Sequence, residues 1–179
     1  GQTPFHQACC SGLSNFPLVA YSLLLDAYPN AIKMKDCDGN TPLHLARTFG
    51  CSLDVISFLL ERYPQAVHEK DDYGQTPLDA CPVAYPNHSS LIKERMNRVK
   101  KLLTMKKGCK SAAKEMFSYF IRTEWWGGVL LMHDAHPIVT QKLLNVADSV
   151  IPSLLTVVGR SCRMLTMWKI LSKRQDLLN

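Results

Sequence analysis

The feature that most constrains this chain is an internal repeat of eight residues. Gly1–Ala8 recurs as Gly39–Ala46 and again as Gly74–Cys81, with the glycines 38 and then 35 residues apart. A second landmark keeps the same step, because the segment Tyr28–Ala31 returns 35 residues later as Tyr63–Ala66. Two independent landmarks at one period indicate tandem structural units that stack on one another.

The residues of the second copy have clear local roles. Gly39 supplies a turn that favours a positive φ. Thr41 can cap a helix, and Pro42 suits the first helical position, where its missing N–H costs nothing. Gly50 can close this short helix in a left-handed conformation. We therefore expect a short helix after each Thr-Pro pair.

A second helix follows in the same unit. Residues 53–60 carry the pattern of a buried helical stripe, and Pro64 is expected to stop the helix. The apolar positions of this stripe are Val55, Ile56, Leu59 and Leu60. Each unit therefore reads as a helix–turn–helix followed by a loop.

The motif Thr41-Pro42-Leu43-His44-x-Ala46 resembles the hallmark of the ankyrin repeat, a unit of roughly 33 residues. The resemblance covers residues 1–104, as a truncated unit 1–35, a full unit 36–70 and a degenerate unit 71–104 with a second helix at 89–105. In the first unit Phe5 replaces Leu, and in the third Asp79 replaces His. The units are longer than the family norm, which is similar to ankyrin proteins of unicellular algae. The implied fold is an all-α solenoid with residues 105–179 as a helical cap over its end.

The resemblance implies a scaffold that binds a protein through loop tips and the surface of the inner helices, without catalysis. Carried over to this sequence, the partner-binding positions are Cys37, Asp38, Asn40, Thr48, Asp72, Tyr73 and Gln75. The histidines of the motif, His6 and His44, are expected to tie adjacent units together by hydrogen bonds. An alternative is a regulatory arm of a larger enzyme or channel.

The net charge of +6 is the sum of two unlike parts. Residues 1–88 carry five basic and nine acidic side chains, a net charge of −4, whereas residues 89–179 carry sixteen and six, a net charge of +10. Any acidic partner should therefore be sought at residues 89–114. We also expect the two parts to attract one another by their opposite charge.

The basic residues concentrate in one predicted amphipathic helix. Its apolar stripe is Ile92, Met96, Val99 and Leu103. The basic patch on its other faces is Lys93, Arg95, Arg98, Lys100, Lys101, Lys106, Lys107 and Lys110. Three interpretations stay open: a solvated face, a target for calmodulin or an anionic membrane surface, and a nuclear-import or nucleic-acid contact. No aromatic residue interleaves the run, which disfavours single-strand stacking.

The C-terminal segment shows helical patterning without the repeat. An apolar stripe comprises Ala113, Met116, Phe117, Phe120 and Ile121. We expect Trp125-Trp126-Gly127-Gly128 to break this helix, with one tryptophan buried and the other half-exposed. Further helices are expected from Pro137, from Pro152 and over residues 161–178.

The remaining signals are mostly negative. The seven cysteines are odd in number and form no Cys-x-x-Cys pair, which favours a reducing compartment, cytoplasmic or nuclear. None of the phosphate-loop, dinucleotide, zinc-protease or nucleophile-elbow motifs is present. His133 and His136 lack further ligands nearby, so we expect no bound metal. Because the catalytic motifs are absent, we also expect no cofactor and no catalytic residue. The absence of a starting Met suggests the end of a longer array.

Overall fold

The computed structural model describes residues 1–11, 16–80, 89–106 and 109–140. The chain separates into two compact units, Gly1–Leu103 and Thr104–Asn179, and each is described here by itself. In the described ranges the regular elements are all helical, which confirms the all-α expectation. The helices expected from Pro152 and over residues 161–178 lie outside these ranges.

The first unit is a row of helix pairs. Short inner helices α1 (Pro4–Cys10) and α3 (Pro42–Thr48) lie side by side, and outer helices α2 (Leu18–Ala27) and α4 (Leu53–Arg62) follow them. Helix α5 (Ser89–Thr104) is the outer helix of the third copy, close to its predicted bounds. The core between the rows includes Leu43, Ala46, Ile56 and Leu60, all 1% exposed or less.

Local sequence explains where these helices begin and end. Capping boxes at Thr3 and Thr41 open the inner helices, each with a proline in the first turn. Gly50 adopts φ 71° after α3, as predicted. The Tyr-Pro landmark ends α2 and α4 and starts a 3-10 helix after each, η1 (Pro29–Lys33) and η2 (Pro64–His68). These 3-10 turns take up the residues that lengthen the unit.

The motif histidines are buried and bridge structural elements. In the second copy, Nδ1 of His44 accepts the Thr41 backbone N–H at 3.1 Å and lies 2.9 Å from the Thr41 hydroxyl. Because a backbone N–H can only donate, the ring proton is on Nε2, which donates to the Gln75 carbonyl at 3.2 Å. His6 repeats this arrangement with Thr3 and donates to the Met34 carbonyl at 3.2 Å. The expected link between adjacent units is confirmed for His44, whereas the acceptor of His6, Met34, lies in the same unit as His6.

The third copy keeps only half of this arrangement. Asp79 stands where the other copies have histidine, and its Oδ2 accepts the Thr76 N–H at 2.9 Å and the Thr76 hydroxyl at 2.7 Å. These hydrogen bonds hold the pKa of Asp79 below its ordinary value. An ionised carboxylate has no proton to donate onward, and the motif here forms a turn rather than a helix.

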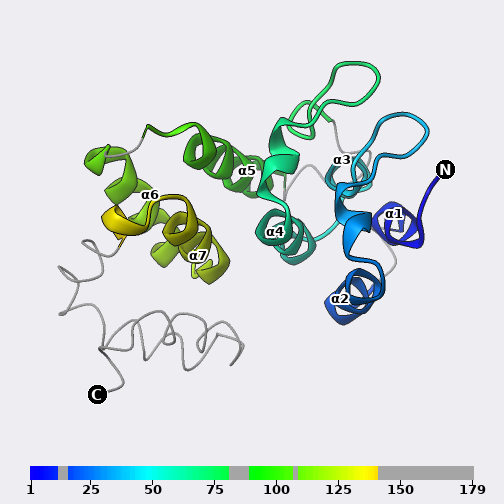
Figure 1. The fold of residues 1–179 in the computed structure, drawn as a ribbon, viewed down its shortest axis with the longest axis horizontal. Helices are drawn as coiled ribbons and strands as arrows, with labels where there is room; N and C mark the ends of the chain where they lie inside the picture. The colour runs from blue at the N-terminus through cyan, green and yellow to red at the C-terminus, as the bar shows by residue number, and fades with distance from the viewer. Residues whose placement is uncertain (12–15, 81–88, 107–108, 141–179) are drawn as a thin grey trace. The chain divides into compact units, whose positions relative to one another are not determined.

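Two hairpin loops project from the same side of the first unit, before α3 and before the third copy's turn (Figure 1). Gly39 and Gly74 both adopt φ 76° at equivalent places in these loops. A Cβ on Gly39 would lie 2.7 Å from the backbone nitrogen of Asp72, whereas one on Gly74 would meet nothing within 4 Å. Gly39 is therefore required both by its positive φ and by the close approach of Asp72, whereas Gly74 is required only by its positive φ.

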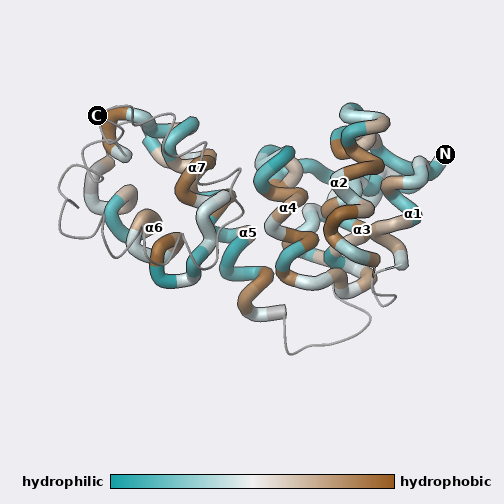
Figure 2. The backbone as a smooth tube through the Cα atoms, turned by 90° about the horizontal axis from the view of Figure 1, so that it is seen from below, coloured by the Kyte–Doolittle hydropathy of each residue, from teal (hydrophilic) through white to brown (hydrophobic). Residues whose placement is uncertain are grey.

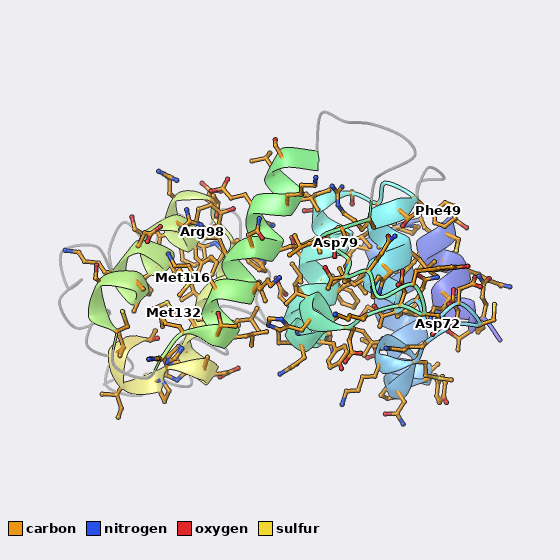
Figure 3. The ribbon with its side chains drawn as sticks, turned by 90° about the horizontal axis from the view of Figure 1, so that it is seen from above. Phe49, Asp72, Asp79, Arg98, Met116 and Met132 are labelled. Atoms are coloured by element: carbon orange, nitrogen blue, oxygen red, sulfur yellow. The ribbon has the colours of Figure 1, made fainter. Side chains whose placement is uncertain are left out.

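The second unit corrects two expectations. Helices α6 (Lys110–Arg122) and α7 (Trp126–Ala135) pack together, with Met116 and Met132 fully buried between them (Figure 3). The glycines after the tryptophans lie inside α7 and do not break a helix. Both tryptophans are 5% exposed, so the expectation of one half-exposed ring is wrong. Trp125 precedes α7, and it therefore does not need to share a helical face with Trp126.

Close packing explains how Trp125 is hidden. Its ring meets that of Phe120 edge-on, with centroids 5.3 Å apart. A Cβ on Gly128 would lie within 2.9 Å of both rings, so a glycine is what lets them approach α7. The described part of the helix expected from Pro137 reaches Thr140.

We expect His44 to make stability depend on pH. Burial is the largest cause that lowers the pKa of His44, so the unfolded chain binds this proton more readily than the folded chain. The free energy of unfolding should therefore fall as the pH drops below about 6.5. His44→Gln should cost about 1–3 kcal/mol at pH 7.5 and should lose less stability than the wild type between pH 7.5 and 5.5. Urea unfolding at both pH values measures this, with exposed His68→Gln as the control. Equal pH dependence of wild type and His44→Gln would contradict it.

The two hairpin glycines provide a matched pair of substitutions. Gly74→Ala should destabilise by about 1–2 kcal/mol, the cost of a left-handed alanine. Gly39→Ala should cost about 1–3 kcal/mol more, because its methyl group also overlaps the next hairpin. The comparison uses the midpoints of chemical denaturation. Equal losses in the two variants would show that the hairpins do not approach as closely as described.

Candidate functional site: the hairpin tips

Each hairpin tip is held by an aspartate that opens it. Oδ1 of Asp36 accepts the backbone N–H groups of Asp38 and Asn40, at 3.0 and 2.8 Å. Oδ1 of Asp71 makes the same two bonds in the next copy, to Tyr73 and Gln75 at 2.9 and 2.8 Å. Backbone bonds also close each loop, from the Asp36 N–H to the Asn40 carbonyl at 3.0 Å and from the Asp71 N–H to the Gln75 carbonyl at 2.9 Å. The tips are therefore defined loops that present their other side chains in a fixed way.

Most of the predicted partner-binding residues lie on these two tips and are exposed. In the first tip Cys37 and Asp38 are exposed, and Asn40 is half-buried with its amide 3.4 Å from Asp36 Oδ2. In the second tip Asp72, Tyr73 and Gln75 are exposed. Tyr73 is 77% exposed, an unusual state for a large aromatic ring.

The two tips are joined directly and at their bases. The Asp72 N–H donates to the Asp38 carbonyl at 3.1 Å, so the two exposed carboxylates belong to neighbouring residues of adjacent loops. At the base, Lys35 donates to the Lys70 carbonyl at 2.7 Å and pairs with Glu69 at 3.1 Å. The Lys35 bond is the largest cause that lowers the pKa of Glu69. These links bring the predicted tip residues into one surface.

The inner-helix part of the predicted surface is small. Residues Pro42–Arg47 of α3 are buried, and Thr48 is half-buried at its end. The next residue, Phe49, is 38% exposed (Figure 3). Phe49 was not among the residues singled out from the sequence. Asp36 and Asp71 were not singled out either, and their shared spacing of three residues before each loop glycine was the available signal for their loop-forming role.

Only some residues of the basic patch are exposed. Lys93, Lys100, Lys101 and Lys106 are exposed, and Arg98 lies 3.6 Å from Glu94. Arg95 is a correction: it is 7% exposed and donates to the Ser57 hydroxyl of α4. Arg95 is next to the stripe residue Met96 in the sequence, so its side chain lies near the buried side of α5 and reaches α4. Leu102, 1% exposed, continues the stripe where Leu103 was expected. Lys107 and the side chain of Lys110 lie outside the described residues.

A metal site and a membrane-spanning helix each have structural requirements that the described residues do not meet. Residues 1–11, 16–80, 89–106 and 109–140 contain no group of three or more His, Cys, Asp or Glu side chains arranged to hold a metal ion. Across the same ranges, none of the helices combines the length and apolar character that a bilayer-spanning segment needs.

A comparison with protein families gives the same picture as the fold. Residues 5–94 match the family model for ankyrin repeats in three copies, which is half of the chain. The comparisons with curated proteins and with solved structures found no significant match. The repeated Thr-Pro caps, bridging histidines and projecting hairpins account for that match in physical terms, and the chain belongs to the ankyrin-repeat family.

Proposed function

We propose that this chain is a protein-binding scaffold that holds its partner on the two hairpin tips. Ankyrin repeats generally serve as protein–protein interaction modules and are typically not catalytic. The tips supply what such a module needs, namely exposed side chains on loops that are fixed before binding. The proposal applies equally to an array that acts alone and to one that regulates a larger enzyme or channel.

The observation that carries the proposal is the exposed ring of Tyr73 beside two carboxylates. The carboxylates of Asp36 and Asp71 bond to their own loops. Asp38 and Asp72 are exposed and their side chains take no part in those bonds, and the Asp72 carboxylate lies against Gly39 of the neighbouring hairpin. Tyrosine is among the residue types that dominate binding energy at interfaces. A partner with arginine or lysine around an apolar cleft would complement this surface, since opposite charges steer association and fix its register.

The alanine triple variant Asp38→Ala, Asp72→Ala, Tyr73→Ala tests the proposal. These three side chains take no part in the Asp36 and Asp71 bonds that hold the loops, so the variant should keep its unfolding midpoint. It should lose proteins that the wild-type chain captures from its native lysate, by at least about tenfold if Tyr73 is a hot spot. Quantitative mass spectrometry of the captured proteins measures this loss.

A second triple variant is a matched control, because it removes the same residue types elsewhere. Asp26, Asp54 and Tyr28 are exposed on or beside the outer helices, away from the tips. Their replacement by alanine should leave the captured proteins unchanged. A captured set that is the same for the wild type and the tip variant would refute tip binding.

A further inference from the structure

Helices α2 and α4 are equivalent outer helices whose residues correspond at the 35-residue step. Leu23 of α2 corresponds to Phe58 of α4, and Leu24 corresponds to Leu59. A difference in burial between two corresponding residues therefore shows where one helix is covered by a neighbouring element and the other is not. Helix α4 has a neighbour on both sides in the first unit, since α2 packs on it and α5 is bonded to it.

The two sides of α4 can be told apart. Ser57 lies toward α5, because its hydroxyl accepts from Arg95. A helix turns by about 100° per residue, so Val55 and Leu59 lie on the face opposite Ser57. That face is the one available to α2. Both residues are buried, at 5% and 1% exposure, and Phe58 at its edge is 8% exposed.

The equivalent face of α2 is apolar and largely uncovered. Ala20 and Leu24 are half-buried, and Leu23 is 63% exposed. In α4 the guanidinium of Arg62 lies 5.3 Å from the Phe58 ring and helps to cover it, but α2 has the short Ala27 at that place. Helix α2 is mostly hydrophobic (Figure 2), and Asp26 is its one acidic or basic residue. The residues of this face are apolar, like those of a buried helix contact, but they are partly or largely exposed to solvent.

The other end of the array is different. Asp79 lacks the donor through which His44 reaches the following copy. The outward residues of α5 include Lys93, Asn97 and Lys100, which are exposed and polar. A polar outer face is what a terminal unit of a repeat array needs. The outward face of α5 is therefore polar, whereas the corresponding outward face of α2 is apolar.

We propose that the face formed by Ala20, Leu23 and Leu24 is a stacking surface for a further ankyrin unit joined ahead of Gly1. Its outer helix would lie on α2 as α2 lies on α4. It would present the side that corresponds to the one α2 turns toward α4, which the correspondence with Ser57 marks at Ser22. The polar face of α5 does not match this apolar surface, so head-to-tail stacking of two copies is disfavoured.

The test compares the 179-residue chain with one extended by a copy of residues 36–73, so that a tyrosine precedes Gly1 as Tyr73 precedes Gly74. Two substitutions on α2 are matched, because both replace an exposed aliphatic residue by glutamate. Leu23 corresponds to buried Phe58, but Val19, 60% exposed, corresponds to exposed Asp54. Only Leu23→Glu should therefore interfere with a stacked unit.

The extended chain should gain helix in proportion to its length and unfold about 5 °C higher than the 179-residue chain. Leu23→Glu should remove most of this gain, and Val19→Glu should leave it. In the unextended chain both variants should shift the midpoint by no more than about 2 °C. Circular dichroism during heating measures all of these values.

Three results would overturn the proposal. The first is an added unit that stays unfolded or gives no gain. The second is an equal effect of Leu23→Glu and Val19→Glu in the extended chain. The third is a dimer of the 179-residue chain in light scattering that either substitution dissociates, since a second copy would then be the occupant. Capture by the tips is measured separately and should not respond to either substitution.

Discussion

The stacking of the first unit depends on the buried imidazole of His44, which hydrogen-bonds to two copies of the repeat. The imidazole of His44 accepts from Thr41 at the start of its own helix and donates to the Gln75 carbonyl of the next hairpin. One neutral side chain thereby fixes the start of α3 and the position of the following loop. The bond needs the neutral tautomer with its proton on Nε2, which burial favours by lowering the pKa. The order of the tips, and hence the surface they present together, follows from this bridge.

The same position explains how the array stops. Asp79 satisfies the N-terminal donors of its own turn as well as histidine does, but its carboxylate only accepts. A single change from an imidazole to a carboxylate therefore preserves the local cap and removes the link to a following unit. This separation of the two tasks is visible only because both versions of the motif occur in one chain.

Local chemistry made much of the fold predictable from sequence, and contacts distant in the chain limited the rest. Thr41, Gly50 and Pro64 act on their immediate neighbours, so their roles could be read from spacing alone. Arg95 could not be placed in this way, because its burial depends on Ser57, 38 residues earlier. Trp125 was misjudged because it lies outside α7, beside a left-handed Glu124 at φ 52° and packed on Gly128. For the candidate site, the exposed tip residues were predicted, but Phe49 was not, since the depth of α3 in the core is a property of the stacked array.

The division of labour among the tip aspartates bears on how such a surface can diversify. Asp36 and Asp71 hold the loop backbones, and the glycines at positions 39 and 74 permit their turns. The residues between them, Cys37 and Asp38 in one loop and Asp72 and Tyr73 in the other, contribute outward side chains that the loop does not require. Substitution there changes what the surface contacts at little cost in folding free energy. A scaffold with fixed loop-forming positions and free display positions can therefore acquire a new partner without first acquiring a new fold.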